Sequence, residues 1–448
     1  MSCDSLEIVP FKNQNKIQVD IPGSKSISNR ALILAALNNK PVKLNGILIS
    51  EDVEIMISCL GQLGIKIDEV AEDNTLLVNG TSGTIPVLKG DLNVGNAGTV
   101  ARFLTAFLAL QPSGEFRLDG SEAMRKRPMG GLINALESHG AKFEFIGEEN
   151  CFPFTIKCNG LTSESWEIDA SNSSQILSAI LLIAPLINGN TRINLLNGTV
   201  SRPFVDMTLE MMKEFANEVT CDFILSDDCY EIPFFQYQLP QNEYQVEPDA
   251  TAASYFLSLP IAVGGCVHVN GIQDCRLQGD IEFCKVISKC GLSISKTVHG
   301  IEVSFIDRIA GGNFDFNNIS DTFLTLAALY PLVQSSLKIL GIAHTRKQET
   351  DRVSGMVKEL RKFGLTIEEE EDSIFIKQCS DLNKFIMERP IEIETYKDHR
   401  FAMSFAILGS HDLFKDQRPW IQILDPMCCT KTFPRFFDVL SQCRLDAR

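Results

Sequence analysis

The stretch Pro22-Gly23-Ser24-Lys25-Ser26-Ile27-Ser28-Asn29-Arg30, which runs into the apolar segment 31–37, decides how this chain folds. A Pro-Gly turn and several serines ahead of strong helix formers predict a helix with unpaired N–H groups in its first turn. Lys25 and Arg30 add two cations to this positive end of the helix dipole. The pattern indicates a site for phosphate or carboxylate, and the alternative is an ordinary capped surface helix.

The same pattern, a polar turn followed by an apolar helix, recurs along the chain. Successive helix starts are 72, 76, 75, 72 and 77 residues apart. They are Ser26, Gly98, Ser174, Asp249, Asp321 and Asp398. A second helix follows most of these starts and ends near a small residue: Gly64, Gly140, Ala216, Gly291 and Gly364. We therefore predict about six strand–helix–strand–helix–strand–strand repeats with their first helices buried, rather than an open solenoid.

Composition and charge limit the classes of partner. The net charge of -16 argues against a nucleic-acid or anionic-membrane surface. No apolar run reaches the roughly 18 residues of a membrane span, and residues 1–20 lack a signal-peptide core. The 14 cysteines form no C-x-x-C motif and the six histidines no H-x-x-x-H motif. We expect no metal site and no cofactor, with reduced thiols in the cytoplasm.

Basic residues gather at the predicted helix starts, although the protein is acidic. They are Lys25, Arg30, Arg102, Arg125, Lys126, Arg127, Arg202, Arg346, Lys347, Arg352, Arg400 and Lys431. This clustering predicts a cation-lined cleft that binds anions. The alternative is that each arginine pairs with a nearby carboxylate. Two acids share the region: Asp321 at a helix start and Glu349 three residues before Arg352, which predicts a shared helical face. Both are candidates for proton transfer. Asp321 could equally be an N-cap, and Glu349 a first-turn acid.

Several of these motifs, taken in order, resemble those of the enolpyruvyl transferase family, in particular its branch that acts on shikimate 3-phosphate. The resemblance covers nearly the whole chain. The matching motifs are Pro22 to Arg30, Gly95-Asn96-Ala97-Gly98-Thr99, Arg127-Pro128, Ser173-Ser174-Gln175, Glu349-Thr350-Asp351-Arg352, Asp398-His399-Arg400, Leu424-Asp425-Pro426 and Lys431-Thr432-Phe433-Pro434.

The resemblance implies an α/β fold, a two-domain inside-out α/β barrel with six βαβαββ repeats. Residues 1–22 with 246–448 would form the C-terminal lobe, and residues 23–245 the N-terminal lobe. Two crossovers, near Pro22 and Val246, would join the lobes, which close over the substrates. A site without water strengthens cation–phosphate contacts and protects the intermediate.

The activity implied is transfer of the enolpyruvyl group of phosphoenolpyruvate to the 5-hydroxyl of shikimate 3-phosphate, with release of phosphate, in aromatic amino acid biosynthesis. The partners implied are these two small molecules, without nucleic acid or membrane, and the protein would be a cytoplasmic monomer. Cations would stabilise the developing charge, so that no metal is needed.

Site residues carry over from the resemblance position by position. The predicted phosphoenolpyruvate-binding residues are Lys25, Gly98, Arg127, Gln175, Arg352, Arg400 and Lys431. The predicted acceptor-binding residues are Lys25, Ser26, Arg30, Ser173, Ser174, Gln175, Ser201, Asp321, His344 and Gln348. Asp321 would take the hydroxyl proton, and Glu349, with Lys25, would protonate the methylene carbon and later remove that proton. The small Gly98 implies sensitivity to glyphosate, a family inhibitor at the phosphoenolpyruvate subsite.

Departures from the family's pattern lie mainly on the acceptor side. Gln348 stands where the family has Lys, Phe204 where a Tyr is common, and His344 and Lys397 where Asn is common. Lys347 neighbours Gln348, but on an extended backbone its side chain would point the other way. Two alternatives therefore remain beside the shikimate 3-phosphate enzyme. One is a paralogue with another phosphorylated cyclic alcohol as acceptor, and the other is a catalytically impaired homologue that only binds.

Overall fold

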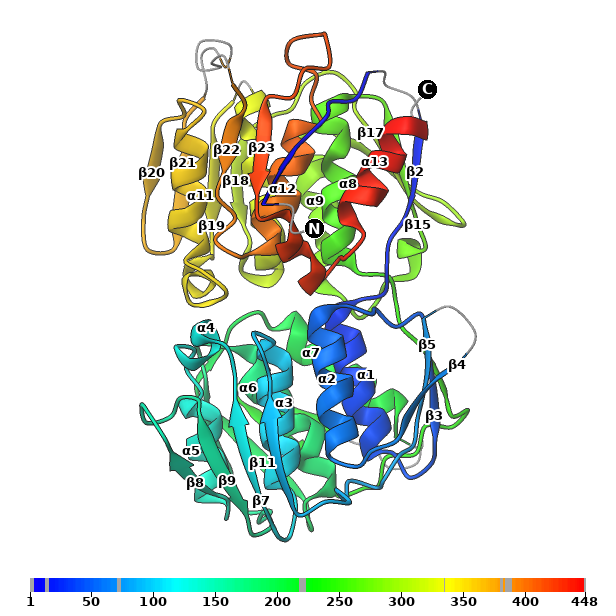
Figure 1. Ribbon diagram of the computed structural model, residues 1–448, viewed down its shortest axis with the longest axis vertical. Coiled ribbons are helices and arrows are strands. Elements are labelled where there is room, and N and C mark those ends of the chain that lie inside the picture. Colours follow the sequence, from blue (N-terminus) through cyan, green and yellow to red (C-terminus); the bar gives the residue numbers. More distant parts are fainter. Residues whose placement is uncertain are drawn as a thin grey trace. The chain divides into compact units, whose positions relative to one another are not determined.

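The structure is a computed structural model that describes residues 4–12, 16–70, 74–216, 223–333, 335–378, 382 and 389–446. The chain separates into two compact units. We call Gly23–Glu247 the continuous unit, and Met1–Pro22 with Pro248–Arg448 the discontinuous unit. Figure 1 shows the elements of both units, coloured along the chain.

The continuous unit contains three repeats. The first has α1 (Lys25–Leu37), β3 (Val42–Asn45), α2 (Glu51–Gln62), β4 (Ile67–Val70) and β5 (Thr75–Val78). The second has β6 (Lys89–Asn93), α3 (Gly98–Ala109), β7 (Gly114–Asp119), α4 (Glu122–Arg125), α5 (Gly130–Ser138), β8 (Lys142–Phe145) and β9 (Phe154–Cys158). The third has β10 (Trp166–Ala170), α6 (Ser174–Ile183), η1 (Ala184–Leu186), β11 (Thr191–Thr199), α7 (Pro203–Glu214), β12 (Ile224–Leu225) and β13 (Cys229–Ile232), and β14 (Glu243–Gln245) follows.

The discontinuous unit begins with β1 (Ser5–Glu7) and β2 (Lys16–Asp20) and continues after residue 247. Its first repeat has α8 (Ala250–Val263), β15 (Cys266–Asn270), η2 (Ile272–Asp274), η3 (Gly279–Glu282), α9 (Phe283–Lys289), β16 (Ser293–Lys296) and β17 (Gly300–Ser304). The next has β18 (Gly312–Asp315), η4 (Asn317–Thr322), α10 (Phe323–Ala328), η5 (Tyr330–Leu332), β19 (Leu337–Leu340), η6 (Ala343–Lys347), α11 (Arg352–Arg361), β20 (Ile367–Glu369) and β21 (Ser373–Ile376). The last has β22 (Ile391–Ile393), α12 (His399–Gly409), β23 (Ile421–Leu424), η8 (Pro426–Lys431) and α13 (Phe436–Asp446).

Among the described residues, six small mixed sheets match the six predicted repeats. In the second repeat the strand order is β6-β7-β9-β8, with β6 and β7 parallel and the later pairs antiparallel. The strand before the first helix of each unit pairs within the other unit. β2, which precedes α1, pairs with β15 of the discontinuous unit, and β14, which precedes α8, pairs with β3 of the continuous unit. This exchange puts the first strands in the discontinuous unit, where β1 completes a three-stranded sheet β1-β23-β22.

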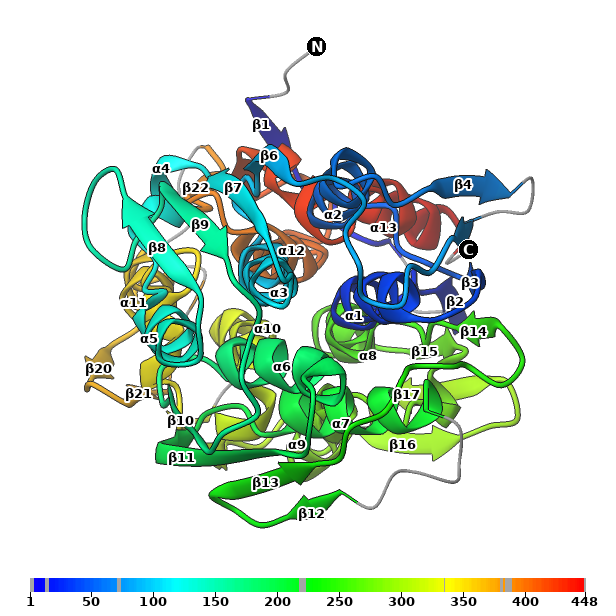
Figure 2. The ribbon, with the colours of Figure 1, turned by 90° about the horizontal axis from the view of Figure 1, so that it is seen from below.

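The first helix of each repeat is buried on all sides. In α1 every residue from Ile27 to Leu37 is buried, and α3 is buried over its full length. Figure 2 shows α1, α3 and α6 at the centre of the continuous unit, with its strands around them, and contacts of α3 with α1 and α6 agree with this view. A helix that is apolar all round must lie inside. The predicted inside-out arrangement is therefore confirmed within each unit.

Two details of the repeat pattern differ from the prediction. In the last repeat, among described residues, the two final strands are replaced by β1 and the chain ends in α13. In the fifth repeat the first helix is broken, since Ile319 departs from helical dihedrals and α10 begins only at Phe323. The glycines predicted to end second helices do have positive φ, for example +85° at Gly64 and +74° at Gly364.

Candidate active site

The first turn of α1 carries Lys25 and Ser26 in the continuous unit. Ser24 is the N-cap residue, but its side chain makes no capping hydrogen bond, so it does not occupy the positive end of the helix. Nζ of Lys25 lies 3.5 Å from Oδ2 of Asp52, a buried acid at the start of α2. The sequence analysis did not single out Asp52 as this partner.

Arg30 is not a surface cation, because only 2% of it is exposed. Its Nε donates to Oγ1 of Thr208 at 2.7 Å, and Nη2 donates to the carbonyl of Phe204 at 3.0 Å and to Oγ of Ser178 at 3.3 Å. Nη1 donates to the carbonyl of Ser26 at 3.0 Å. These partners are all neutral, and burial lowers the pKa of Arg30 to about 9. Arg30 thus links the start of α1 to α6 and α7.

Gly98 and Arg127 lie against each other at the start of α3. A Cβ added to Gly98 would be 2.9 Å from Nη1 and 3.0 Å from Nη2 of Arg127. Nε and Nη1 of Arg127 are buried and have no hydrogen-bond partner among the described residues. Arg127 was predicted to lie at a helix start, but it lies in the link between α4 and α5. Two buried guanidinium nitrogens without partners favour an anionic ligand.

The start of α6 brings Ser173, Ser174 and Gln175 together. Ser173 is the N-cap residue, and its hydroxyl accepts from the backbone N of Gln175 at 3.3 Å. Ser174 is buried, and Oε1 of Gln175 is buried without a partner among the described residues. Ser201, just before α7, is buried with φ +49°, a conformation that non-glycine residues adopt mainly where the surroundings hold them.

In the discontinuous unit, Arg352 joins three carboxylates. Its Nη1 is 2.8 Å from Oδ1 of Asp321, its Nη2 is 2.9 Å from Oε2 of Glu349, and its Nε is 2.7 Å from Oδ2 of Asp398. Arg352 is only 1% exposed. Burial alone would lower the pKa of Arg352, but Asp398, Glu349 and Asp321 outweigh it and raise this pKa.

Two further cations complete this group. Nη2 of Arg400 contacts Oδ2 of Asp321, and Nζ of Lys431 is 2.8 Å from Oε1 of Glu349. Asp321 therefore bridges two guanidinium groups, and Glu349 bridges a guanidinium and an ammonium group. We call Asp321, Glu349, Arg352, Asp398, Arg400 and Lys431 the acid–base cluster.

Local structure explains how these side chains meet, and it corrects two alternatives. Glu349 precedes the N-cap Asp351 of α11, so it is neither on the helical face of Arg352 nor a first-turn acid; the bend before α11 brings it to Arg352. Asp321 is not an N-cap, since it lies inside η4 and Thr322 precedes α10. Asp398 caps α12, accepting from the backbone N of Arg400 at 3.0 Å.

The acceptor-side residues His344 and Gln348 lie beside the acid–base cluster. Nε2 of His344 is 2.8 Å from Oγ of Ser320, and burial lowers the pKa of His344 despite the opposing effect of nearby acids, so the imidazole is neutral at pH 7. Oε1 of Gln348 accepts from Nη1 of Arg352. Lys347 is exposed at the end of the 3-10 helix η6, not on an extended backbone as predicted.

Comparisons with known proteins agree with this geometry. The family profile described as EPSP synthase (3-phosphoshikimate 1-carboxyvinyltransferase) matches residues 12–440. The chain belongs to the EPSP synthase family. A 3-phosphoshikimate 1-carboxyvinyltransferase of Opitutus terrae is 44% identical over 98% of both chains. One of Nostoc punctiforme is 38% identical over 98% of this chain and 100% of its own. These matches confirm the predicted family and, with it, the predicted transferase function.

Solved EPSP synthase structures support the fold. An EPSP synthase of Acinetobacter baumannii superposes with a TM-score of 0.78 at 22% identity, covering 98% of this chain and 97% of its own. The predicted two-domain inside-out α/β fold is confirmed. No helix among the described residues is long and apolar enough to cross a membrane. The described His, Cys, Asp and Glu residues form no group that could hold a metal ion.

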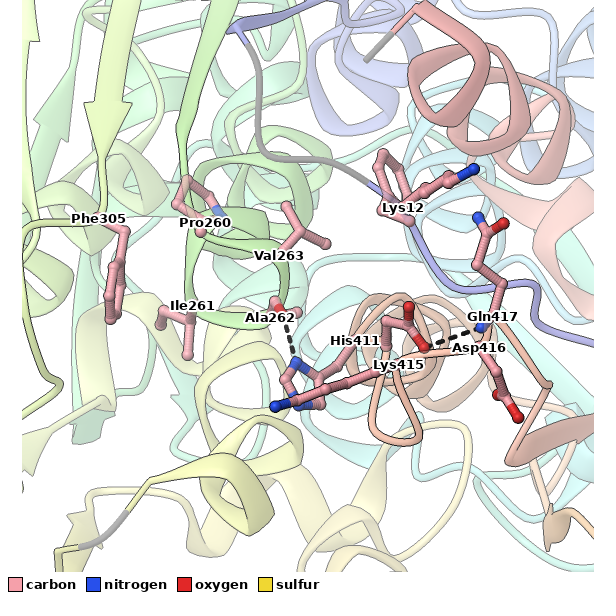
Figure 3. A pocket seen from close by; sticks show the side chains of 13 residues that line it. Lys12, Pro260, Ile261, Ala262, Val263, Phe305, His411, Lys415, Asp416 and Gln417 are labelled. Atoms are coloured by element: carbon pink, nitrogen blue, oxygen red, sulfur yellow. Dashed lines mark hydrogen bonds between the residues drawn. The ribbon is translucent and has the colours of Figure 1, made fainter. Parts of the chain in front are cut away.

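A cavity of about 730 Å³ in the discontinuous unit lies apart from the predicted site residues (Figure 3). It is found where α8 and α12 end, and its lining includes Lys12, Val263, Phe305, His411 and Lys415. Nδ1 of His411 lies 2.6 Å from the carbonyl oxygen of Ala262 there. The predicted site residues of this unit lie instead around the starts of α11 and α12 and in η4, η6 and η8.

Proposed function

We propose that this chain transfers the enolpyruvyl group of phosphoenolpyruvate to the 5-hydroxyl of shikimate 3-phosphate, releasing phosphate. The observation that carries the proposal is the acid–base cluster in a member of the EPSP synthase family: two carboxylates are each held by two cations. Such pairs provide both a proton acceptor and an anion-binding surface. The two compact units are the proposed lobes of the transferase.

Substrate binding draws on both units in this proposal. Phosphoenolpyruvate is bound by Lys25, Gly98, Arg127, Gln175, Arg352, Arg400 and Lys431. The acceptor is bound by Lys25, Ser26, Arg30, Ser173, Ser174, Gln175, Ser201, Asp321, His344 and Gln348. The unpartnered atoms of Arg127 and Gln175 support these assignments, because a ligand would satisfy them.

The chemistry is an addition followed by an elimination. The acceptor oxygen bonds to C2 of phosphoenolpyruvate, its proton passes to Asp321, and Glu349 protonates C3. The C2–O bond to phosphate then breaks, Glu349 takes back a C3 proton, and the proton on Asp321 leaves with the phosphate. Nζ of Lys431, 2.8 Å from Glu349 Oε1, is placed to protonate that carboxylate before the addition and to take the proton back after the elimination. Lys25 is the second cation proposed to assist Glu349.

The second candidate is a paralogous transferase with another phosphorylated cyclic alcohol as acceptor. It is favoured by Gln348, which binds Arg352 and adds no charge of its own. Phe204 argues less strongly, because its backbone carbonyl, not its side chain, anchors Arg30.

An acceptor panel separates these candidates. Phosphate release from phosphoenolpyruvate is measured with shikimate 3-phosphate, with unphosphorylated shikimate and with other phosphorylated cyclic alcohols. We expect saturable release with shikimate 3-phosphate and at least tenfold less with the others. Release with a different phosphorylated alcohol alone would establish the paralogue. Release with none, but restored by Gln348→Lys, would establish the impaired homologue.

We further propose a cytoplasmic monomer. The described cysteines are all free, which supports a reducing compartment. Light scattering on the purified protein tests the monomer, which a mass near twice 49.7 kDa would contradict.

A further inference from the structure

Asp280 is a buried acid that the mechanism above does not use. It lies in η3 and is 5% exposed. Its Oδ2 accepts from the hydroxyl of Thr251 in the first turn of α8. Gln278 holds the same segment to α8, since its Oε1 accepts from the backbone N of Ala250 at 2.9 Å and its Nε2 donates to the carbonyl of Pro248 at 2.7 Å.

η3 also packs against η4, the segment that carries Asp321. Asp280 is therefore close enough to interact electrostatically with Asp321, and with Arg400 on α12. Burial raises the pKa of Asp280, and so do Asp321 and Asp249. The Thr251 hydroxyl and Arg400 oppose this rise, and the pKa is about 7. Asp280 thus gains or loses its charge near neutral pH.

A comparison of repeats shows what is unusual about Asp280. In the first repeat of the continuous unit, Asp52 at the start of α2 meets Lys25, the first residue of α1. In the corresponding repeat of the discontinuous unit, Asp280 meets Thr251, which is neutral. The charge of Asp52 is thus compensated by a lysine, whereas that of Asp280 acts on Asp321 and Arg400.

We propose that Asp280 is a positioning residue. Its negative charge lets Asp321 take the proton of the acceptor hydroxyl although Arg352 and Arg400 both contact Asp321. This inference rests on the base role proposed for Asp321. Two guanidinium groups favour the ionised form of Asp321 and so oppose its protonation, and a second carboxylate nearby restores the affinity for a proton. Asp280 neither gains nor loses a proton in the cycle; it acts through Asp321.

Other charged groups surround the pair, among them Asp398, which binds Arg352, and they are the same in the wild type and in Asp280→Asn. Arg352, Arg400 and Asp249 face it from α11, α12 and the start of α8. His344, beyond η6, is neutral because its pKa is lowered. Tyr255 on α8 is neutral too, since burial raises its pKa. Below about pH 7 Asp280 binds a proton, its charge disappears, and we expect Asp321 to become a poorer base.

The test is the ratio of kcat/KM of Asp280→Asn to that of the wild type between pH 5.5 and 8.5, because this ratio cancels the ionisation of the substrates. Asparagine keeps the volume and the acceptor for Thr251. We expect a ratio near one at pH 5.5 that falls to about one tenth at pH 8.5, with a midpoint near pH 7. A ratio that is the same at every pH, whether reduced or not, would overturn the inference.

A second variant keeps the carboxylate and moves its titration. Thr251→Val removes the hydroxyl that favours the charged form of Asp280. In the wild type, kcat/KM should fall as Asp280 binds a proton below about pH 7, and Asp280→Asn should lack this fall. In Thr251→Val the same fall, the acidic limb of the profile, should lie about one pH unit higher. An unmoved limb would count against the proposal, even if Asp280→Asn folded poorly.

Asp321→Asn separates this inference from the proposed function. We expect it to lose activity at every pH. If it kept wild-type activity, the base role of Asp321 would be wrong. If it were inactive while the Asp280→Asn ratio stayed flat, the base role would stand and only the role of Asp280 would fall.

Discussion

The two units hold their predicted substrate-binding cations in different electrostatic settings. In the continuous unit, Arg30 donates to neutral groups, Nε and Nη1 of Arg127 have no partner among the described residues, and Nζ of Lys25 lies 3.5 Å from Oδ2 of Asp52. In the discontinuous unit, Arg352, Arg400 and Lys431 all contact carboxylates. The first setting suits capture of anions, whereas the second suits proton transfer, because each carboxylate of the acid–base cluster contacts a cation that stabilises its charged form.

The largest expected effect belongs to the acid–base cluster. Glu349→Gln keeps one acceptor oxygen, for Arg352 or Lys431, but cannot exchange a proton. We expect kcat to fall by about 10²- to 10⁴-fold, the usual loss on removing a general acid–base group. Steady-state kinetics measures it, with Glu369→Gln as the control, because Glu369 pairs with Arg346 outside the cluster. A loss smaller than tenfold would break the assignment of proton transfer to this unit.

The two settings should also differ in how much an arginine contributes to the free energy of unfolding. Arg352→Ala leaves three carboxylates without their shared buried cation, and we expect it to cost about 3–5 kcal/mol of unfolding free energy. Arg127→Ala removes a guanidinium whose Nε and Nη1 lack partners, and should cost less than about 1 kcal/mol. Urea unfolding of both variants gives the two values. Equal costs would mean that the two settings do not differ.

Arg127→Ala should instead lose binding. We expect kcat/KM for phosphoenolpyruvate to fall about 10- to 100-fold, the value of one or two charge-assisted hydrogen bonds. Arg125→Ala is the matched control, since Arg125 lies two residues before Arg127, is exposed and pairs with Asp119. Equal losses in both variants would show that this region acts through general charge and not through a specific contact.

The smallest expected effect is at Gly98. An added methyl group would lie 2.9 Å from the Arg127 guanidinium, so this group must shift by a few tenths of an ångström. We expect Gly98→Ala to raise KM for phosphoenolpyruvate and the inhibition constant of glyphosate by about three- to tenfold. Inhibition curves at fixed substrate measure it. Unchanged glyphosate sensitivity would contradict the placement of Gly98 and Arg127 in one subsite.

The sequence predicts the repeats better than it predicts the contacts. Spacing and all-round apolar helices were enough for six repeats with buried first helices, because helix burial follows from local composition. The contacts of Glu349 and Asp321 depend on a bend and a broken helix, which no periodicity reveals. Asp280 and Asp52 were missed for the same reason: each is one acid near a helix start, and only the packing of η3 or α2 gives it a partner.

Deuterium incorporation at C3 tests the addition–elimination most directly. The protein is incubated in D₂O with phosphoenolpyruvate and shikimate 3-phosphate, and the methylene groups of recovered phosphoenolpyruvate and product are analysed by NMR. We predict deuterium in both when both substrates are present, and in neither with Glu349→Gln or without shikimate 3-phosphate. Release of phosphate with no deuterium at C3 would contradict the account, because C3 would then never have been protonated.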